Sequence, residues 1–314
     1  MSNPKILHRV YFDDMPPYND PYLHFLDTWK EQLPDYTIMH WNASNLFQPY
    51  NQWVKRALDN NAPVFISEYI RWKALSVYGG VYLDADCEVL NGLELHRLVE
   101  ELYSSTEYHA FLGVEEYGNG FPTAQTVAAK KDSPLVSFML DLYDNALSSP
   151  LWHWREERGL IGPQLLSLYF RENGYTKDKG FFCRLEAPMV QCGVKVYTQD
   201  YFSPKFTTTG TTLNISPHTC VYHLFSNSNV EEVDPEAKKH REHPLRFNEY
   251  CEYLKKVSQL KPEIIENDSL SSVYCVRNDE GKIDVKKVGS LFLKDPFFVI
   301  KRTLVLCRRL CNCL

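Results

Sequence analysis

Apolar positions recur along the chain with two different spacings. Residues 5–12 and 36–41 are short runs rich in Ile, Leu, Val and aromatic side chains, which predict two strands. Between them a helix is predicted, with Asp20 as N-cap, Pro21 at the first helical position and Pro34 beyond its end. Its apolar face repeats every three or four residues, at Tyr22, Phe25, Leu26, Trp29 and Leu33.

A longer helix follows, and then a strand that ends in acidic residues. The helix is predicted from Pro63 to about residue 78, where Gly79-Gly80 stops it. Residues 81–83 form a short predicted strand that leads into Asp84-Ala85-Asp86. Further helix starts are predicted at Ser133-Pro134 and Gly162-Pro163. This alternation predicts an α/β fold, in which ligands bind beyond the carboxyl ends of the strands.

The pattern changes beyond about residue 230. Residues 231–243 are almost all charged or polar, as in a linker or a solvated surface. An amphipathic helix is predicted around residues 247–257, and a hairpin over residues 272–292. We therefore divide the chain into a main domain (1–230), an accessory helix and hairpin (231–292) and a C-terminal helix (293–314).

The C-terminal helix is predicted to be basic and amphipathic. Residues 297–314 contain four basic and no acidic side chains, and Lys294, Lys301 and Arg308 are spaced to form one stripe. Such a helix is too short and too charged to span a bilayer, but it can lie in the interface of an anionic membrane. The alternative is a helix packed on the main domain with its cations solvated.

Composition and charge narrow the functional classes. The chain has 314 residues, 44 % of them hydrophobic, which suits a folded globule. A net charge of -6 argues against a general nucleic-acid binder. The nine cysteines are odd in number and form no CxxC pair, unlike a disulfide framework or a zinc site. With neither a signal-peptide core nor a long apolar run, a reducing cytoplasm is the expected setting.

Asp84 and Asp86 are the first candidates for chemistry. Two carboxylates that flank one residue at a strand end can chelate Mg²⁺ or Mn²⁺. A metal held there can neutralise a diphosphate leaving group. Asp-x-Asp is a common tripeptide, so a solvated loop is the alternative.

Glu68 and Arg71 lie one helical turn apart on the helix that precedes this strand, and they share one face. Arg71 can hold phosphate or sugar oxygens, and Glu68 can accept hydrogen bonds from sugar hydroxyls. The alternative is an ion pair within the helix.

The segment that contains these residues resembles a known family. Residues 67–89 read SEYIRWKALSVYGGVYLDADCEV, which is similar to the sugar-binding region of glycosyltransferase family 32. This family includes bacterial capsule and O-antigen transferases and is distantly similar to the glucosyltransferase domains of large clostridial toxins. The resemblance extends over about residues 4–228, with weaker matches at residues 162–166 and 201–204.

The resemblance implies a GT-A fold for residues 1–230, a nucleotide-sugar donor, a divalent metal and retention at the anomeric carbon. It implies that Asp86 binds the metal directly and that Asp84 lies near the ribose and the metal. Arg71 matches an arginine that contacts the donor. Glu68 stands where most relatives have Asp, which bears on the choice of donor sugar.

Three further residues are carried over from the resemblance. His223 matches a histidine that helps to close the diphosphate–metal site, although relatives often follow it with a tryptophan that is absent here. A purely structural histidine is the alternative. Tyr11 and Phe12, at the end of the first strand, correspond loosely to the residues that line the nucleotide.

We therefore expect a cytoplasmic glycosyltransferase that uses Mn²⁺ or Mg²⁺ and a nucleotide sugar, with UDP favoured and GDP possible. Its expected acceptor is a glycan or lipid-linked glycan in surface polysaccharide synthesis, with possible peripheral attachment to the inner face of the membrane. The alternatives are a toxin-like protein glycosyltransferase, a non-catalytic sugar- and metal-binding module, and a phosphoryl-transfer hydrolase.

Overall fold

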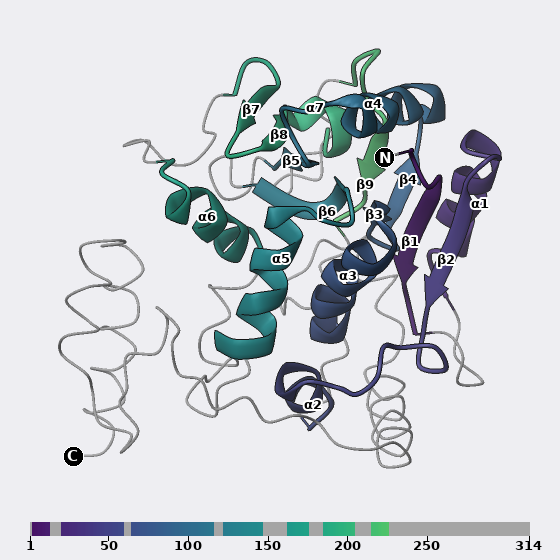
Figure 1. Cartoon of the computed structure of the whole chain (residues 1–314). Helices are drawn as coiled ribbons and strands as arrows, with labels where there is room; N and C mark the ends of the chain where they lie inside the picture. Colours follow the sequence, from purple (N-terminus) through teal and green to yellow (C-terminus); the bar gives the residue numbers. More distant parts are fainter. Residues whose placement is uncertain are drawn as a thin grey trace, which may run out of the picture.

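A seven-stranded mixed sheet organises the part of the chain that the structure describes (Figure 1). The computed structural model describes residues 2–12, 20–59, 64–115, 122–146, 162–175, 185–204 and 215–225. In spatial order, the strands of the sheet are β2 (Thr37–Trp41), β1 (Ile6–Val10), β3 (Gly80–Leu83), β6 (Pro122–Ala129), β5 (Ala110–Val114), β8 (Val194–Tyr197) and β7 (Met189–Gln191).

The strand directions explain where a site can form. β1 is parallel to both β2 and β3, while β6 runs antiparallel between β3 and β5. β1, β3 and β5 therefore point the same way, and their carboxyl ends lie at one edge of the sheet. β5 is parallel to β8, and β7 is antiparallel to it. The predicted α/β fold class is confirmed.

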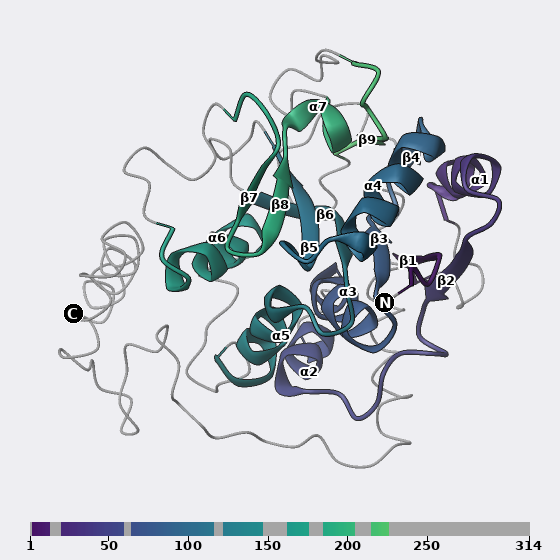
Figure 2. The same cartoon turned by 45° about the horizontal axis from the view of Figure 1, so that its top comes forward.

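Helices cover both faces of the sheet (Figure 2). One face carries α2 (Gln52–Asp59), α3 (Val64–Tyr78), α5 (Pro134–Asp141) and α6 (Pro163–Glu172). The other carries α1 (Leu23–Gln32), α4 (Gly92–Ser104) and the short α7 (Gln199–Phe202). Strand side chains point alternately into the two cores, as the twofold repeat of a strand requires: Val81 faces one core and Tyr82 the other.

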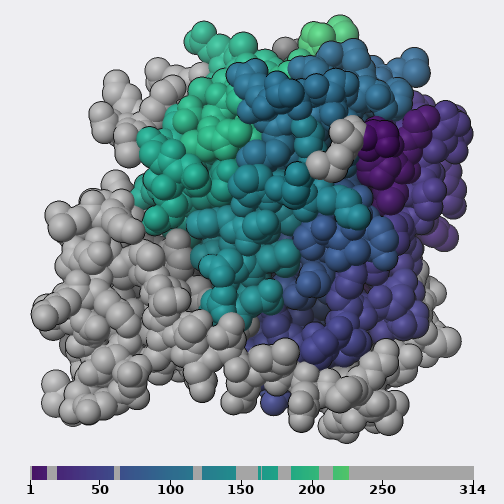
Figure 3. Space-filling view, viewed as in Figure 1, coloured from purple at the N-terminus to yellow at the C-terminus, as the bar shows by residue number. Residues whose placement is uncertain are grey.

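The helices that share one face of the sheet also adjoin at the molecular surface. α3 packs against α5, and in the space-filling view their blue and teal surfaces adjoin below that of α4 (Figure 3). A π-helical turn, Leu142–Ala146, continues α5. It brings Tyr143 over α3, where its ring packs edge-on against Tyr69.

The double glycine after α3 ends the helix as predicted. Gly79 and Gly80 have φ values of 67° and 95°, a region that side chains with a Cβ rarely adopt. A Cβ at Gly80 would also lie 2.6 Å from the Ile6 carbonyl oxygen. The two glycines therefore allow α3 to turn directly into β3 beside β1. The starts predicted for α5 and α6 are confirmed as well.

The start predicted for the first helix is wrong. α1 begins at Leu23, with Tyr22 rather than Asp20 at its N-cap. The Asp20 carboxylate instead accepts the Tyr22 N–H at 2.9 Å and the Arg9 guanidinium at 2.6 Å. Because Arg9 is fully buried, it requires a paired anion, and Asp20 supplies that charge.

A second, two-stranded sheet joins distant parts of the sequence. β4 (Cys87–Val89) pairs with β9 (Val221–His223) in antiparallel register. His223 is the last residue of β9. The accessory helix and hairpin, and the basic helix over residues 293–314, lie outside the described residues. Within the described ranges, no helix combines the length and the apolar character needed to cross a membrane.

His8 on β1 is buried in its neutral form. Its Nε2 lies 2.8 Å from the Gly79 carbonyl oxygen, and the Trp41 indole N–H donates to its Nδ1 at 3.3 Å. This arrangement requires the proton on Nε2 and a lone pair on Nδ1. Burial lowers the pKa of His8 from 6.5 to about 4, against the opposing effect of the Gly79 hydrogen bond.

We expect acid to destabilise the fold through His8. His8 binds a proton more readily in the unfolded chain than in the folded chain. The stabilising effect of neutral His8 is therefore complete above about pH 6.5 and is lost as the pH falls towards about 4. The lost free energy of unfolding is about 3 kcal/mol at most. In urea denaturation at several pH values, His8→Gln should show a shallower decline than the wild type. The exposed-site control His24→Gln should follow the wild type; equal declines for both variants would contradict the prediction.

Candidate active site

Asp84 and Asp86 lie in the turn between β3 and β4, at the carboxyl end of β3. The Asp84 N–H donates to the Gln125 carbonyl at 2.8 Å, and the Cys87 N–H donates to the Asp84 carbonyl at 3.1 Å. The turn is therefore anchored to β6 and closed on itself. Its position is the one expected for a ligand site in such a sheet.

A register shift between β5 and β6 provides the backbone groups that hold the β3–β4 turn. Leu112 of β5 pairs with Val127, but the next residue, Gly113, pairs with Thr123. Residues 124–126 of β6 therefore have no paired residue on β5. The Ala124 carbonyl accepts Arg71 Nη1 at 2.9 Å, while Gln125 holds Asp84. As at other bulges, the irregularity redirects backbone groups, here towards the candidate site.

Arg71 and Asp84 form the first half of the site. Arg71 Nη2 lies 3.2 Å from Asp84 Oδ1, and the Tyr82 hydroxyl donates to the same oxygen at 2.7 Å. The guanidinium also lies over the Tyr82 ring, 4.6 Å from its centroid. Burial acts to lower the pKa of Arg71, but Tyr82, Asp84 and Glu68 outweigh it and raise the pKa, so Arg71 is a permanent cation here.

Glu68 lies one turn before Arg71 but makes a different contact. The Tyr143 hydroxyl donates to Glu68 Oε2 at 3.2 Å. Burial raises the pKa of Glu68 to about 7, although Arg71 opposes the shift. Within the described ranges, the ion pair of Arg71 is with Asp84 and not with Glu68, so the alternative of a pair confined to the helix does not describe it.

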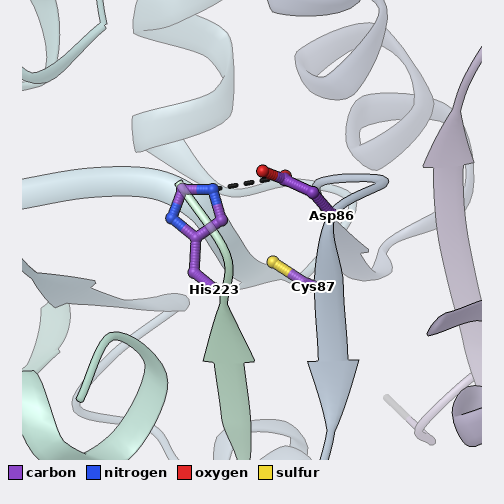
Figure 4. A group of neighbouring side chains, drawn as sticks. All are labelled: Asp86, Cys87 and His223. Carbon is purple, nitrogen blue, oxygen red and sulfur yellow. Dashed lines mark ion pairs between the residues drawn. The ribbon is translucent and has the colours of Figure 1, made fainter. Parts of the chain in front are cut away.

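His223 and Asp86 form the second half. His223 lies directly opposite Cys87 in the β4–β9 pair, and the Leu224 N–H donates to the Asp86 carbonyl at 3.0 Å. His223 Nε2 consequently lies 3.3 Å from Asp86 Oδ1 (Figure 4). Burial acts to lower the pKa of His223, but Asp86 and Glu115 raise it to about 9. The two carboxylates therefore favour a proton on His223 beside Asp86, and a metal ion bound to Nε2 would take the place of that proton.

Glu115 is a further carboxylate that sequence reasoning missed. It follows β5, and its Oε1 lies 3.9 Å from His223 Nδ1 and accepts the Thr123 hydroxyl at 2.7 Å. Burial raises the pKa of Glu115, against the effect of His223. The missed signal was the one that selected Asp84: an acidic residue at the carboxyl end of a buried strand.

The donor atoms present suit a hard divalent cation. Asp86, Cys87 and His223 offer ligand atoms within 4.8 Å of one another. Burial raises the pKa of Cys87 well above its usual value, so its thiol stays neutral, 3.7 Å from the Gln125 carbonyl oxygen. A neutral thiol is a poor ligand, whereas carboxylate and imidazole both bind Mn²⁺. Asp86 and His223 are therefore the residues that could hold the metal.

Tyr11 and Phe12 lie just beyond β1. Phe12 is 5 % exposed and belongs to the hydrophobic core. The Tyr11 ring packs edge-on against Tyr22, 5.8 Å between centroids. The predicted role of these two residues in lining the nucleotide stays a prediction.

Comparison with known families decides the class of chemistry. Residues 22–107 match a family model described as a glycosyltransferase sugar-binding region containing a DXD motif. The chain is a glycosyltransferase. The matched segment of the glycosyltransferase contains α3, β3 and both aspartates of the Asp84-Ala85-Asp86 turn, whereas Glu115 and His223 lie beyond it. A comparison with curated proteins gives no match.

Two solved structures are similar to this glycosyltransferase. One is the PaToxG glycosyltransferase, with 16 % identity over 54 % of this chain and 69 % of that chain, and a TM-score of 0.40. The other is a glycosyltransferase involved in the glycosylation of the major capsid of PBCV-1, with 8 % identity over 75 % of this chain and 98 % of that chain, and a TM-score of 0.41. The functional assignment rests on the matched segment and on the site.

Proposed function

We propose that this glycosyltransferase moves a sugar from a nucleotide-sugar donor to a glycan acceptor, with a divalent metal and with retention of anomeric configuration. The observation that carries the proposal is the juxtaposition of Asp86 and His223, 3.3 Å apart and each about one-tenth exposed. A buried carboxylate and imidazole beside a fixed arginine suit a metal-bound diphosphate.

Asp86 and His223 would hold the metal, and Asp84 would lie beside it and the ribose. Among the described residues, His223 Nδ1 is a buried nitrogen without a hydrogen-bond partner, whereas the second ring nitrogen of a metal-bound imidazole usually donates a hydrogen bond. A bound divalent cation would neutralise charge on the departing nucleoside diphosphate. The nitrogen ligand favours Mn²⁺ over Mg²⁺, which prefers an all-oxygen shell.

Arg71 would bind the diphosphate of the donor. Its guanidinium is fixed by the Ala124 carbonyl and by Asp84, so it needs little ordering when the donor arrives. Its Nε is buried and has no hydrogen-bond partner among the described residues, which leaves a donor for an anionic ligand. A preorganised cation beside the diphosphate stabilises the negative charge that develops there, and so lowers the barrier to departure of the nucleoside diphosphate.

Glu68 would accept hydrogen bonds from hydroxyls of the donor sugar. Tyr143 donates a hydrogen bond to one oxygen of its carboxyl group. Glu68 also lies on the same face of α3 as Arg71, three residues before it. We assign no carboxylate as a covalent nucleophile. The acceptor hydroxyl would attack from the face that the diphosphate leaves, and the leaving phosphate would take its proton.

The finer assignments are part of this proposal. The resemblance of residues 67–89 supports the proposal that the enzyme belongs to family 32 and acts in surface polysaccharide synthesis. We propose a UDP-sugar donor, with a GDP-sugar as the second choice. A cytoplasmic enzyme whose residues 293–314 bind the inner membrane surface would suit a lipid-linked acceptor. A toxin-like protein glycosyltransferase is the second candidate.

A thermal-shift panel of nucleotide sugars tests the proposal. We expect a UDP-sugar with Mn²⁺ to raise the melting temperature, since a ligand at about 100 times its dissociation constant adds about 2.7 kcal/mol of stability. EDTA should abolish the shift. Mass spectrometry should then detect release of the nucleoside diphosphate with an acceptor glycan. Binding without release would indicate a non-catalytic module, and release of inorganic phosphate without sugar transfer would indicate a hydrolase.

A further inference from the structure

We infer that Glu115 is a positioning residue that orients His223, so that the Nε2 lone pair of the imidazole faces the metal beside Asp86. The inference rests on the metal site proposed above. Glu115 directly follows β5, His223 lies on β9 and Asp86 lies in the β3–β4 turn, so the arrangement joins three separate parts of the chain.

The environment of His223 Nδ1 is the first observation. This atom is buried and has no hydrogen-bond partner within the described part of the chain, yet Glu115 Oε1 faces it at 3.9 Å. The side chains of His223 and Glu115 are only 11 % and 12 % exposed, so water has limited access to compensate. A movement of about 1 Å would bring the two atoms to hydrogen-bond length.

Metal chemistry supplies the reason for that movement. A neutral imidazole can bind a cation through Nε2 only if its single proton is on Nδ1. A carboxylate that accepts the Nδ1–H holds this tautomer, restrains rotation of the ring and makes Nε2 a better ligand. The ring now lies between two carboxylates, with Asp86 on the Nε2 side and Glu115 on the Nδ1 side.

Glu115 is itself held in place for this purpose. The Thr123 hydroxyl donates to Glu115 Oε1 at 2.7 Å, and Thr123 pairs with Gly113 only because of the register shift in β6. A regular continuation of the ladder would place Thr126 opposite Gly113 and move Thr123 out of this register. The same irregularity that supports Arg71 and Asp84 thus fixes the oxygen that faces His223.

The test is the Mn²⁺ affinity of the full chain without donor or acceptor, measured from the electron paramagnetic resonance signal of free Mn²⁺. Glu115→Ala should weaken binding by about 10- to 100-fold, as loss of such outer-shell partners does. Glu115→Gln keeps an oxygen that accepts the Nδ1–H, so its loss should be smaller. The exposed Glu107→Ala, just before β5, is the matched control and should bind Mn²⁺ normally.

A double-mutant cycle with His223→Ala separates positioning from the other possible roles. If Glu115 acts through the ring, Glu115→Ala should change affinity by less than about twofold once His223 is absent. A further loss as large as in the wild-type background would overturn the inference, because Glu115 would then act on the cation directly. Unchanged Mn²⁺ affinity in both Glu115 variants would overturn it too, and would point to a purely structural carboxylate.

Failure of the inference is distinguishable from failure of the proposed function. If the wild-type chain binds Mn²⁺ and Asp86→Ala abolishes that binding, the metal site stands whatever Glu115 does. If the wild-type chain binds no Mn²⁺, the metal site fails, and the inference fails with it.

Discussion

Replacement of Asp86 by Ala should reduce sugar transfer by on the order of a hundredfold or more. Asp86 is 7 % exposed and lies against His223, so a bound cation would lose its most directly placed anionic ligand. Loss of a group that stabilises the charge of the transition state typically has an effect of this size. The measurement is kcat/KM with a nucleotide sugar at saturating Mn²⁺.

Two variants make this experiment specific. Asp86→Asn keeps the shape of the side chain but removes its charge, so it should also lose most activity. Asp35→Ala removes an aspartate side chain that is 82 % exposed and lies near Lys5, and it should leave the rate unchanged. Full activity of Asp86→Ala, or full activity of the wild type in EDTA, would contradict metal-dependent catalysis by this turn.

Replacement of Arg71 by Lys should lower kcat/KM by about 100-fold although the positive charge is kept. Arg71 contacts the Ala124 carbonyl and Asp84 through two different nitrogens, which an ammonium group at the end of a flexible stem cannot reproduce. The guanidinium would also lose its position over Tyr82. Nucleoside diphosphate binding and transfer should both be weakened, as isothermal titration and initial rates would show.

A contrast within α3 tests the separate roles of its two polar residues. Glu68→Gln should impair transfer but leave nucleoside diphosphate affinity nearly intact, because Glu68 is assigned to the sugar. The control Arg97→Lys changes an arginine of α4 that is 56 % exposed, and should have no effect on either measurement. If Arg71→Lys has wild-type diphosphate affinity, Arg71 does not bind the diphosphate.

The sequence by itself determined the segment from α3 to Asp86. The helix, the double glycine, the short strand and the acidic turn all follow one another, so their signals are local. Glycine marks the stop because Gly79 and Gly80 adopt positive φ, and the buried run Gly80–Leu83 marks the strand. The α/β class was predictable for the same reason, since alternating spacings within short windows specify alternating elements.

Local signals were insufficient where one residue had several possible partners. Asp20 has the sequence context of a helix cap, but the charge of the buried Arg9 engages it. Glu68 and Arg71 have the spacing of a helical ion pair, yet Asp84 is the partner of Arg71 in the fold. In both cases a buried arginine required an anion, and burial is a property of the folded chain rather than of sequence spacing.

The resemblance to family 32 had named His223, but only the tertiary structure decided how the second half of the site is assembled. His223 reaches Asp86 because β9 pairs with β4, and Glu115 faces His223 because β5 and β6 change register beside it. The apolar pattern of a strand can fix which of its faces is buried, but its partner strand and the place of a register shift depend on contacts between segments far apart in the chain. The local sequence therefore determined the segment from α3 to Asp86, and the pairing of the strands determined that His223 and Glu115 lie opposite it.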